Sequence, residues 1–257
     1  MNNGGKTSVS VIIPVYDVGR FERSLPELTE FLDAASDHSD VELIVVDDRC
    51  PHATMSLAVS RFVQREDVRL IQNDRNRGKG FSVARGMLEA AGDYRVFTDA
   101  DLAYPLREIW RIVATLKQGA DVAIACRVLP GSQYEMSSTY IRYIYTRHLL
   151  SRAFNRIVRT ALLPGVLDTQ AGLKGFTADA ARQVFSKVRI QGFGFDLESL
   201  FIARLRNLRV EQIPVHFRYH DEPSTVRFMR DAGTMAADLA RIRWRGWTGE
   251  YREVSAP

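Results

Sequence analysis

The feature that most constrains the fold is a regular alternation of short apolar runs with helical patterns in the first half of the chain. Runs rich in β-branched residues, which are typical of buried strands, occupy 8–15, 41–46, 68–72, 94–98 and 121–126. Between them, apolar residues recur at helical spacing over 21–35, 55–65, 79–91 and 106–118. Strands that alternate with helices of this length predict an α/β fold, with a mostly parallel sheet and helices on both faces.

The alternation ends after the fifth predicted strand. A loop over 127–138 leads to a long predicted helix over 140–163, an irregular stretch over 168–176 and short helices near 178–184 and 196–206. A last strand is expected over 209–217. The simplest organisation is one domain over 8–226, with a sheet-forming half (8–126) and an elaborated half (127–226). Residues 1–7 are expected to be disordered, and 227–257 to form a basic, aromatic, helical tail.

Composition excludes several classes of protein. With 257 residues, of which 46% are hydrophobic and 26% charged, the chain is neither disordered, collagen-like nor a disulfide scaffold. Cys50 and Cys126 lie in or beside apolar runs without a signal peptide, so we expect free thiols in a reducing, cytoplasmic compartment. No stretch approaches the ~20 apolar residues of a membrane span. We therefore expect a soluble protein, or one that lies on a membrane without crossing it.

The charges are dominated by arginine, with thirty arginines against five lysines and a net charge of +4. Arginine suits phosphate-bearing partners, although genome base composition would produce the same bias. No GxGxxG follows the first strand, which excludes a nicotinamide-binding Rossmann domain. No recognised motif accompanies the basic stretch at 137–167, so nucleic-acid binding is not expected.

Charged residues stand where the predicted strands end. They are Asp17, Asp47, Asp48, Asp99, Asp101 and Arg127. Ligands of a doubly wound sheet bind beyond these strand ends, and crowded carboxylates require a positive partner such as Mg²⁺ with substrate phosphates. A turn or helix N-terminus explains Asp47 and Asp48 equally well, whereas Asp99 and Asp101 flank the end of a buried strand. The glycine-rich run 76–80 is more simply a solvated turn than an anion site.

Six segments in this order resemble family-2 glycosyltransferases of the GT-A fold: SVIIPVY, VVDD, NRGKGFSVARGM, FTDADLAYP, RHLLS and DTQAGLKGF. The similarity covers about 8–226 and is greatest to dolichyl- and polyprenyl-phosphate glucose and mannose synthases. It implies inverting transfer of a hexose from a nucleotide-sugar, UDP-glucose or GDP-mannose, to a polyprenyl phosphate. It also implies Mg²⁺ or Mn²⁺ as cofactor, a nucleotide-sugar half at 8–126 and an acceptor half at 127–226.

The resemblance further implies residues of the donor site. Asp99 and Asp101 would be the DxD pair that holds the metal against the diphosphate, and Arg127 would contact the donor phosphates. Asp47 would accept a hydrogen bond from the base. The whole set implied for the nucleotide-sugar is Pro14, Tyr16, Asp17, Asp47, Asp48, Lys79, Asp99, Ala100, Asp101 and Arg127.

On the acceptor side, the resemblance implies that Arg147 and Ser151 bind phosphate. Asp168, Gln170 and Lys174 would lie near the acceptor, and Asp196 or Glu198 falls where many family-2 enzymes keep a catalytic carboxylate. A helix N-terminal carboxylate stabilised by the macrodipole is an equally good interpretation of Asp196. The residues assigned to catalysis are Asp101, Arg127, Arg147 and Asp196.

The acceptor decides whether a general base is required. A phosphate monoester is largely ionised at neutral pH and attacks without one, whereas a hydroxyl acceptor would need Asp196 or Glu198. A GT-A enzyme with a soluble acceptor is therefore the alternative. A non-catalytic nucleotide-sugar-binding protein is disfavoured by the intact DxD motif.

A lipid acceptor requires a membrane surface. In the predicted helix over 140–163, apolar and basic residues separate onto two sides, which suits an interface with anionic lipid on the cytoplasmic face of a membrane. The tail at 227–257 forms either a second interfacial helix or a homodimer contact, and a separate membrane subunit that presents the acceptor is a further alternative.

Overall fold

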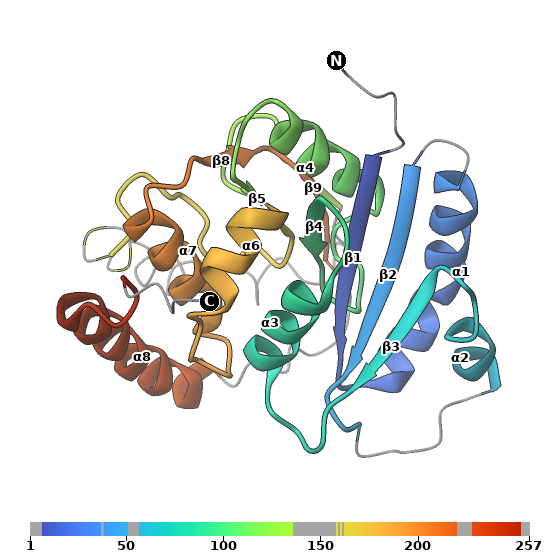
Figure 1. Cartoon of the computed structure of the whole chain (residues 1–257), viewed down its shortest axis with the longest axis horizontal. Coiled ribbons are helices and arrows are strands. Elements are labelled where there is room, and N and C mark those ends of the chain that lie inside the picture. The colour runs from blue at the N-terminus through green and yellow to red at the C-terminus, as the bar shows by residue number, and fades with distance from the viewer. Residues whose placement is uncertain are drawn as a thin grey trace.

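A seven-stranded sheet forms the centre of the part of the chain that the computed structural model describes, which is residues 7–36, 39–50, 57–135, 158, 160, 162–219 and 228–252 (Figure 1). The strand order is β3-β2-β1-β4-β7-β5-β8. The strands of this sheet are β1 (Thr7–Val15), β2 (Ser39–Asp47), β3 (Val68–Gln72), β4 (Tyr94–Phe97), β5 (Val122–Ala125), β7 (Lys174–Thr177) and β8 (Val210–Ile213). A second, two-stranded sheet pairs β6 (Gln133–Glu135) with β9 (His216–Arg218).

Helices cover both faces of the large sheet. The helices with described bounds are α1 (Val18–Ala35), α2 (Leu57–Phe62), α3 (Lys79–Glu89), α4 (Arg107–Lys117), α6 (Ala178–Phe185), α7 (Phe195–Leu205) and α8 (Phe228–Thr248), of which α8 packs on α7 rather than on the sheet. Side chains of β1 alternate between two buried clusters, because successive residues of a strand point to opposite faces. Val11 and Ile13 pack with α1 and α4, whereas Ile12 packs with α3 and α7. The predicted α/β fold with helices on both faces is confirmed.

Strand β7 corrects the prediction of an irregular stretch over 168–176. It inserts antiparallel between β4 and β5, with Lys174 opposite Phe97 and Gly175 opposite Val96. Its four residues, KGFT, include a lysine and a glycine, so they carry little of the β-branched signal that marks the other strands. The sheet is therefore mostly parallel but reversed at β7.

The single strand predicted over 209–217 is also wrong. The segment forms β8 in the large sheet and β9 in the small one, and the break falls at Pro214. Proline has no N–H to donate to a ladder, so the chain leaves the first sheet there and joins the second. The partner of β9 is β6, which lies in the segment predicted as a loop.

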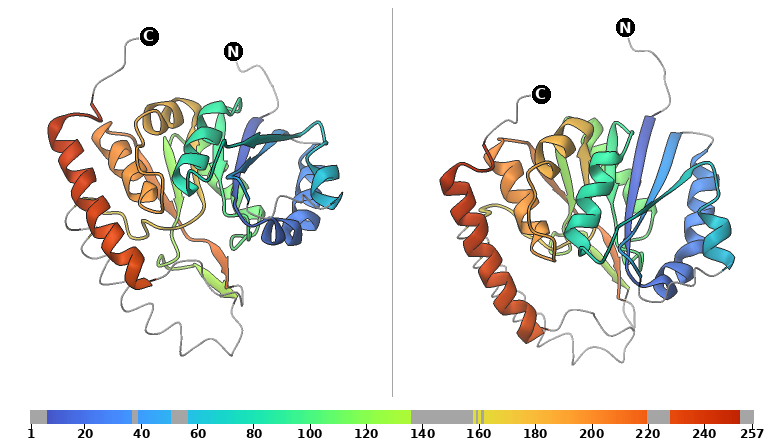
Figure 2. Two further views of the ribbon diagram at one scale, coloured as in Figure 1. Left: turned by 90° about the horizontal axis from the view of Figure 1, so that it is seen from below. Right: turned by 60° about the horizontal axis from the view of Figure 1, so that its bottom comes forward.

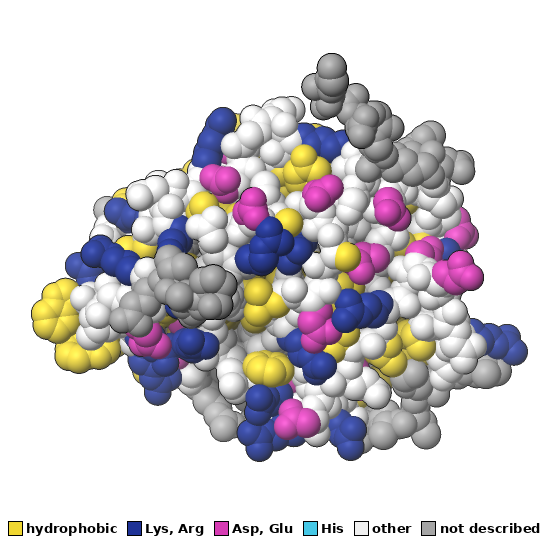
Figure 3. Space-filling view, viewed as in Figure 1, with side chains coloured by type: hydrophobic (Ala, Val, Ile, Leu, Met, Phe, Trp, Pro, Cys, Tyr) yellow, Lys and Arg dark blue, Asp and Glu magenta, His cyan; other side chains and the backbone are white. Residues whose placement is uncertain are grey.

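The tail contains the expected helix, α8. Figure 2 shows α8 along the outside of α7, at the end of the molecule opposite α1 and α2. In Figure 3, hydrophobic side chains gather at the edge where the C-terminal end of α8 lies. No helix within the described ranges is long and apolar enough to cross a bilayer. Most of the predicted helix over 140–163, and residues 1–6, lie outside the described residues.

Both cysteines are free thiols, as predicted. Cys126 is fully buried at the end of β5, and burial raises its pKa. Burial, together with the neighbouring Asp47 carboxylate, raises the pKa of Cys50 to about 12. Neither thiol therefore ionises near neutral pH.

Replacing Gly175 with alanine should destabilise the inserted strand. A Cβ at this position would lie 2.2 Å from Cγ2 of Ile112, so α4 would have to shift. We expect the Gly175→Ala variant to lose about 1–3 kcal/mol of unfolding free energy in a urea titration. Gly192→Ala is the control, because nothing lies within 4 Å of the position that its methyl group would occupy. An equal loss in both variants would contradict the tight packing of β7 against α4.

Candidate active site

Two lysines and two aspartates meet at the end of β4 and form what we call the charge cluster: Lys79, Asp99, Lys174 and Asp196. Lys79 begins α3, Asp99 follows β4, Lys174 begins β7 and Asp196 lies in the first turn of α7. The Lys79 Nζ lies 2.5 Å from Asp99 Oδ1, and Lys174 forms an ion pair with Asp196. The cluster therefore joins residues predicted for the donor side to residues predicted for the acceptor side.

Burial differs within the cluster. Lys174 is fully buried, and its Nζ also donates to the Ala171 carbonyl at 2.6 Å. Burial lowers the pKa of Lys174, against the attraction of Asp196, and the charge of Lys79 lowers it further. For Lys79, burial also disfavours the charged form, but Asp99 and Asp196 outweigh it and raise the pKa. Lys79 therefore holds a positive charge at the more exposed edge of the cluster.

A tight turn after β4 presents Asp99 and Asp101. Leu102 has a φ of +48°, its N–H donates to the Asp99 carbonyl at 3.1 Å, and Oδ1 of Asp101 accepts from Ala103 N at 3.2 Å. Ser24 fixes the middle of the turn by donating to the Ala100 carbonyl at 2.7 Å. The backbone is thus held from both sides of the motif.

Gly172 leaves the space that the Asp99 carboxylate occupies. A Cβ on Gly172 would lie 2.1 Å from Asp99 Oδ2. Any other residue would displace Asp99 from Lys79. The DTQAGLK segment therefore shapes the acidic motif as well as supplying Lys174.

The acidic motif fits a hard divalent cation. Asp99 and Asp101 offer only oxygen donors, which Mg²⁺ and Mn²⁺ prefer, and the Asp99 side chain is 34% exposed. Among the described residues, no three His, Cys, Asp or Glu side chains come together as a complete metal cage. A cation here would complete its shell with water or with phosphate oxygens.

Arg127 and Asp168 form a bidentate ion pair beside the cluster. Arg127 Nε lies 2.7 Å from Asp168 Oδ2 and Nη2 lies 2.9 Å from Oδ1, while the Arg127 backbone N–H donates to Oδ2 at 3.0 Å. Burial alone would raise the pKa of Asp168, but Arg127 outweighs it and lowers that pKa. One edge of the guanidinium is thus committed to Asp168, and Arg127 stays fixed and charged.

Asp48 organises the turn that presents Lys79. Its carboxylate accepts from the backbone N–H groups of Arg77 and Gly78 and from the Asn73 side chain, each at 2.8 Å. Gly78 has a φ of +89°, and a Cβ there would lie 2.5 Å from the Gln191 carbonyl oxygen. Asp48, which is 4% exposed, therefore points into the protein, and the glycine-rich turn is held by protein acceptors.

Asp47 lies at the outer edge. Its Oδ1 accepts from Cys50 N at 3.0 Å and its Oδ2 accepts from the Gln72 side chain at 3.2 Å. Tyr16 is 49% exposed after the end of β1, and Asp17 caps α1 by accepting from Arg20 N. Pro14 pairs in register with Val46. These residues line the end of β1 and β2, where Asp48 also lies but with its side chain buried.

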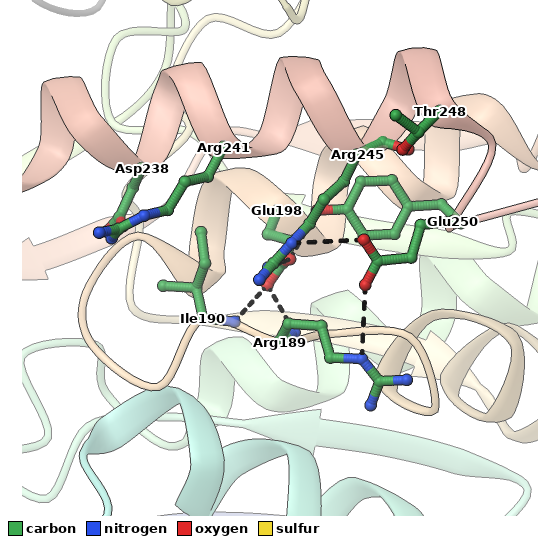
Figure 4. Close-up of polar contacts among 9 residues, drawn as sticks. Arg189, Ile190, Glu198, Asp238, Arg241, Arg245, Thr248 and Glu250 are labelled. Atoms are coloured by element: carbon green, nitrogen blue, oxygen red, sulfur yellow. Dashed lines mark hydrogen bonds and ion pairs between the residues drawn. The ribbon is translucent and has the colours of Figure 1, made fainter.

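Glu198 has a different environment from Asp196, two residues before it. It is fully buried, and its Oε2 accepts from the backbone N–H groups of Arg189 and Ile190 at 2.8 and 2.7 Å (Figure 4). Its Oε1 accepts from Tyr251 at 2.6 Å and from Arg245 at 3.2 Å. Protein donors thus occupy both oxygens, and the observed role of Glu198 is to fasten α8 to α7. We call these contacts the Glu198 latch.

Two predicted residues fall outside the site as described, and sequence reasoning missed one other. Arg147 and Ser151 lie outside the described residues, and Gln170 is half-buried beside the cluster segment. The residue missed is Gly172, which leaves the space for the Asp99 carboxylate. It falls inside the DTQAGLKGF segment, which indicated the region but not the role of this glycine.

Known proteins resemble the chain over most of its length. The family model for Glycosyl transferase family 2 matches residues 10–185. A dolichyl-phosphate beta-glucosyltransferase of Dictyostelium discoideum is 29% identical over 95% of this chain and 76% of its own. The enzyme of the same name from Drosophila melanogaster is 31% identical, over 96% and 78%.

One solved structure supports the fold. It is glucosyl-3-phosphoglycerate synthase from Mycobacterium tuberculosis, in complex with Mn²⁺, UDP-glucose and phosphoglyceric acid. It covers 93% of this chain, and this chain covers 80% of it, with a TM-score of 0.66 and 18% identity. At that identity the likeness concerns the fold alone.

Removing the charge of Glu198 should loosen the latch. We expect Glu198→Gln to lose about 2–3 kcal/mol of unfolding free energy, because four donors then face a neutral amide with only one acceptor oxygen. Urea denaturation measures this loss. Glu250→Gln is the matched control, since Glu250 also contacts Arg245 but at 3.5 Å and with its side chain 45% exposed. Similar losses in the two variants would contradict a specific role for the buried carboxylate.

Proposed function

Because the chain belongs to glycosyl transferase family 2 and is a glycosyltransferase, we propose that it transfers a hexose from a nucleotide-sugar to a polyprenyl or dolichyl phosphate. The observation that carries this proposal is the similarity to dolichyl-phosphate beta-glucosyltransferases over 95–96% of the chain. It favours glucose as the hexose and UDP-glucose as the donor, with GDP-mannose as the alternative.

The donor diphosphate would bind at the edge formed by Asp99, Asp101 and Lys79. Asp99 and Asp101 would hold Mg²⁺ or Mn²⁺, which supplies positive charge to the departing diphosphate. Lys79 adds a cation whose protonated form Asp99 already stabilises. Arg127, held rigid by Asp168, adds a second fixed cation on the acceptor side of the motif. Charges fixed in advance of the reaction are the most effective kind of electrostatic catalysis.

The nucleoside would lie over the ends of β1 and β2. Tyr16 offers an exposed ring, and Oδ2 of Asp47 meets the side-chain amide of Gln72 at 3.2 Å, a long contact that a base could replace. Asp48 would not contact the nucleoside itself but would support the site, because it holds the turn that presents Lys79. Pro14 and Ala100, which have no polar side-chain atoms, would border the nucleotide-sugar through their backbone.

The acceptor phosphate would attack C1 of the sugar from the side opposite the diphosphate, with inversion. A bond forms between a phosphate oxygen and C1 while the bond from C1 to the diphosphate oxygen breaks, and no proton needs to be removed. Lys174 pairs with Oδ1 of Asp196, whose side chain is only 6% exposed, so this carboxylate is a paired, buried group and poorly placed to act as a base for a hydroxyl acceptor. This pairing favours an already ionised phosphate as nucleophile. Arg147, Ser151 and Gln170 are the proposed acceptor contacts.

A lipid acceptor places the reaction at a membrane surface. We propose peripheral association with the cytoplasmic face of a membrane, and the similarity to dolichyl-phosphate beta-glucosyltransferases supports a lipid acceptor there. A soluble acceptor is the competing function, and the lipid dependence of transfer separates the two.

The test is a transfer assay with Mg²⁺ or Mn²⁺, using UDP-glucose and GDP-mannose, each with and without a short polyprenyl phosphate in detergent. We expect an organic-soluble hexose product that requires both the lipid and the metal, and that chelation with EDTA abolishes. Donor turnover that ignores the lipid would contradict the lipid acceptor and indicate a soluble one.

The Asp101→Ala variant should lose at least about 100-fold in transfer rate, since a fixed charge at the diphosphate is removed. The measurement is the initial rate at saturating donor. Asp179→Ala is the control, because Asp179 is an aspartate on the surface of α6 with its side chain 81% exposed. Undiminished transfer by Asp101→Ala would refute the assignment of the DxD motif.

A further inference from the structure

The outer face of α8 carries an aromatic pair that the fold does not use. Trp244 is 62% exposed and Trp247 is 78% exposed, with ring centroids 5.4 Å apart. The C-terminal part of α8, which carries them, lies at the edge of the molecule where hydrophobic side chains gather in Figure 3. Exposing two neighbouring indole rings to water is unfavourable, and such an apolar patch indicates a surface that binds a partner.

The opposite face of α8 fixes the helix to the protein. Ile242 is fully buried, and a Cβ on Gly246 would lie 2.6 Å from the Phe201 ring of α7. Asp238 is 4% exposed beneath Gly194. Among the described residues, these inner contacts secure α8 and leave Trp244 and Trp247 exposed for a different purpose.

The charge around the pair favours an anionic partner. Residues 238–248 contain three arginines, of which Arg245 is engaged by Glu198 at 3.2 Å. Arg241 pairs with the buried Asp238 at 3.0 Å but keeps its side chain 61% exposed. Arg241 and Arg243 are exposed, and the helical spacing of about 100° per residue places them on either side of Trp244 around α8. Helices with tryptophan on one side and arginine at its borders are typical of elements that lie in the headgroup layer of a bilayer.

The Glu198 latch gives this surface a fixed relation to the charge cluster. Arg245, near the end of α8, and Tyr251, just after it, both donate to Glu198 on α7 (Figure 4). The first turn of α7 also carries Asp196 of the charge cluster. Glu198 also holds the backbone of 189–190, and the next residue, Gln191, accepts from Gly80 N at 2.7 Å, beside Lys79. A bilayer that binds α8 is thereby held in a set orientation to the site.

Resting on the proposed lipid acceptor, we propose that Trp244 and Trp247, bordered by Arg241 and Arg243, form the surface through which this protein docks onto an anionic lipid bilayer. The indole rings enter the headgroup layer and the guanidinium groups contact lipid phosphates. Docking holds the protein at the surface of the membrane in which the tail of the lipid acceptor stays.

The test is co-sedimentation with vesicles of phosphatidylcholine mixed with phosphatidylglycerol, compared with vesicles of phosphatidylcholine alone. We expect wild type to bind the anionic vesicles more strongly, and the double variant Trp244→Ala/Trp247→Ala to bind them at least about tenfold more weakly. Leu88→Ala, which removes another exposed apolar side chain, 42% exposed on α3, is the control and should bind like wild type. Urea unfolding of each variant verifies that the fold is unchanged.

Activity with two acceptors separates docking from chemistry. The double variant should transfer normally to a short, water-soluble polyprenyl phosphate but about tenfold more slowly to a long-chain one embedded in the vesicles. If no variant transfers to either acceptor while the vesicle binding still differs, the proposed function fails and the docking surface stands. Unchanged vesicle binding by the double variant overturns the docking surface. So does a shift from dimer to monomer in sedimentation equilibrium with vesicle binding retained, because the pair would then be a contact between two copies of this chain.

Discussion

The buried ion pair between Lys174 and Asp196 is the interaction on which the site depends. Moving an ammonium group into the interior costs several kcal/mol, and only a well-placed opposite charge offsets that cost. Lys174 begins the inserted strand β7 opposite Phe97, and Asp196 lies in the first turn of α7. The pair therefore fixes the register of β7 and the start of α7 together. Because β7 pairs directly with β4, the same contact connects the start of α7 to the strand that leads to Asp99.

Around this pair, each charged side chain is held by another element. Asp48 holds the turn before Lys79, Asp168 holds Arg127, and Gly172 leaves room for Asp99. The supporting contacts are short and mostly buried, so the charges at the open edge lose little freedom when a ligand binds. A site supported in this way is suited to stabilising a charge that develops during a reaction.

The parallel part of the fold was predictable because it depends on local patterns. In 8–126, each β-branched run predicts a strand and each helical spacing predicts a helix without reference to distant segments. The position of Asp99 and Asp101 at the end of a strand follows from these local predictions. Strand β7 was not predictable, since KGFT lacks the run of β-branched residues that marks the other strands, and only its neighbours β4 and β5 make it a strand. Pairings such as Arg127 with Asp168, 41 residues apart, depend on the fold and leave no local signal.

Neighbouring carboxylates likewise show that local sequence does not predict which side chain of a pair faces the site. Asp196 and Glu198 differ by about 200° around a helix, so spacing alone does not decide which of them faces the cluster and which faces α8. Asp47 and Asp48 point to opposite sides at the end of a strand, and one of them is buried as a structural acceptor. Sequence identified both pairs as candidates, and the partners that distinguish their members come from distant segments.

We propose above all that the edge formed by Lys79, Asp99 and Asp101 binds the diphosphate of the donor together with a divalent cation. The most direct measurement is a calorimetric titration of UDP, and of GDP, into wild type and into the Asp99→Asn/Asp101→Asn variant, with and without Mn²⁺. The structure predicts that one nucleotide binds wild type more tightly when Mn²⁺ is present and that the variant shows no such gain. Equal affinities in both proteins, with or without Mn²⁺, would contradict it.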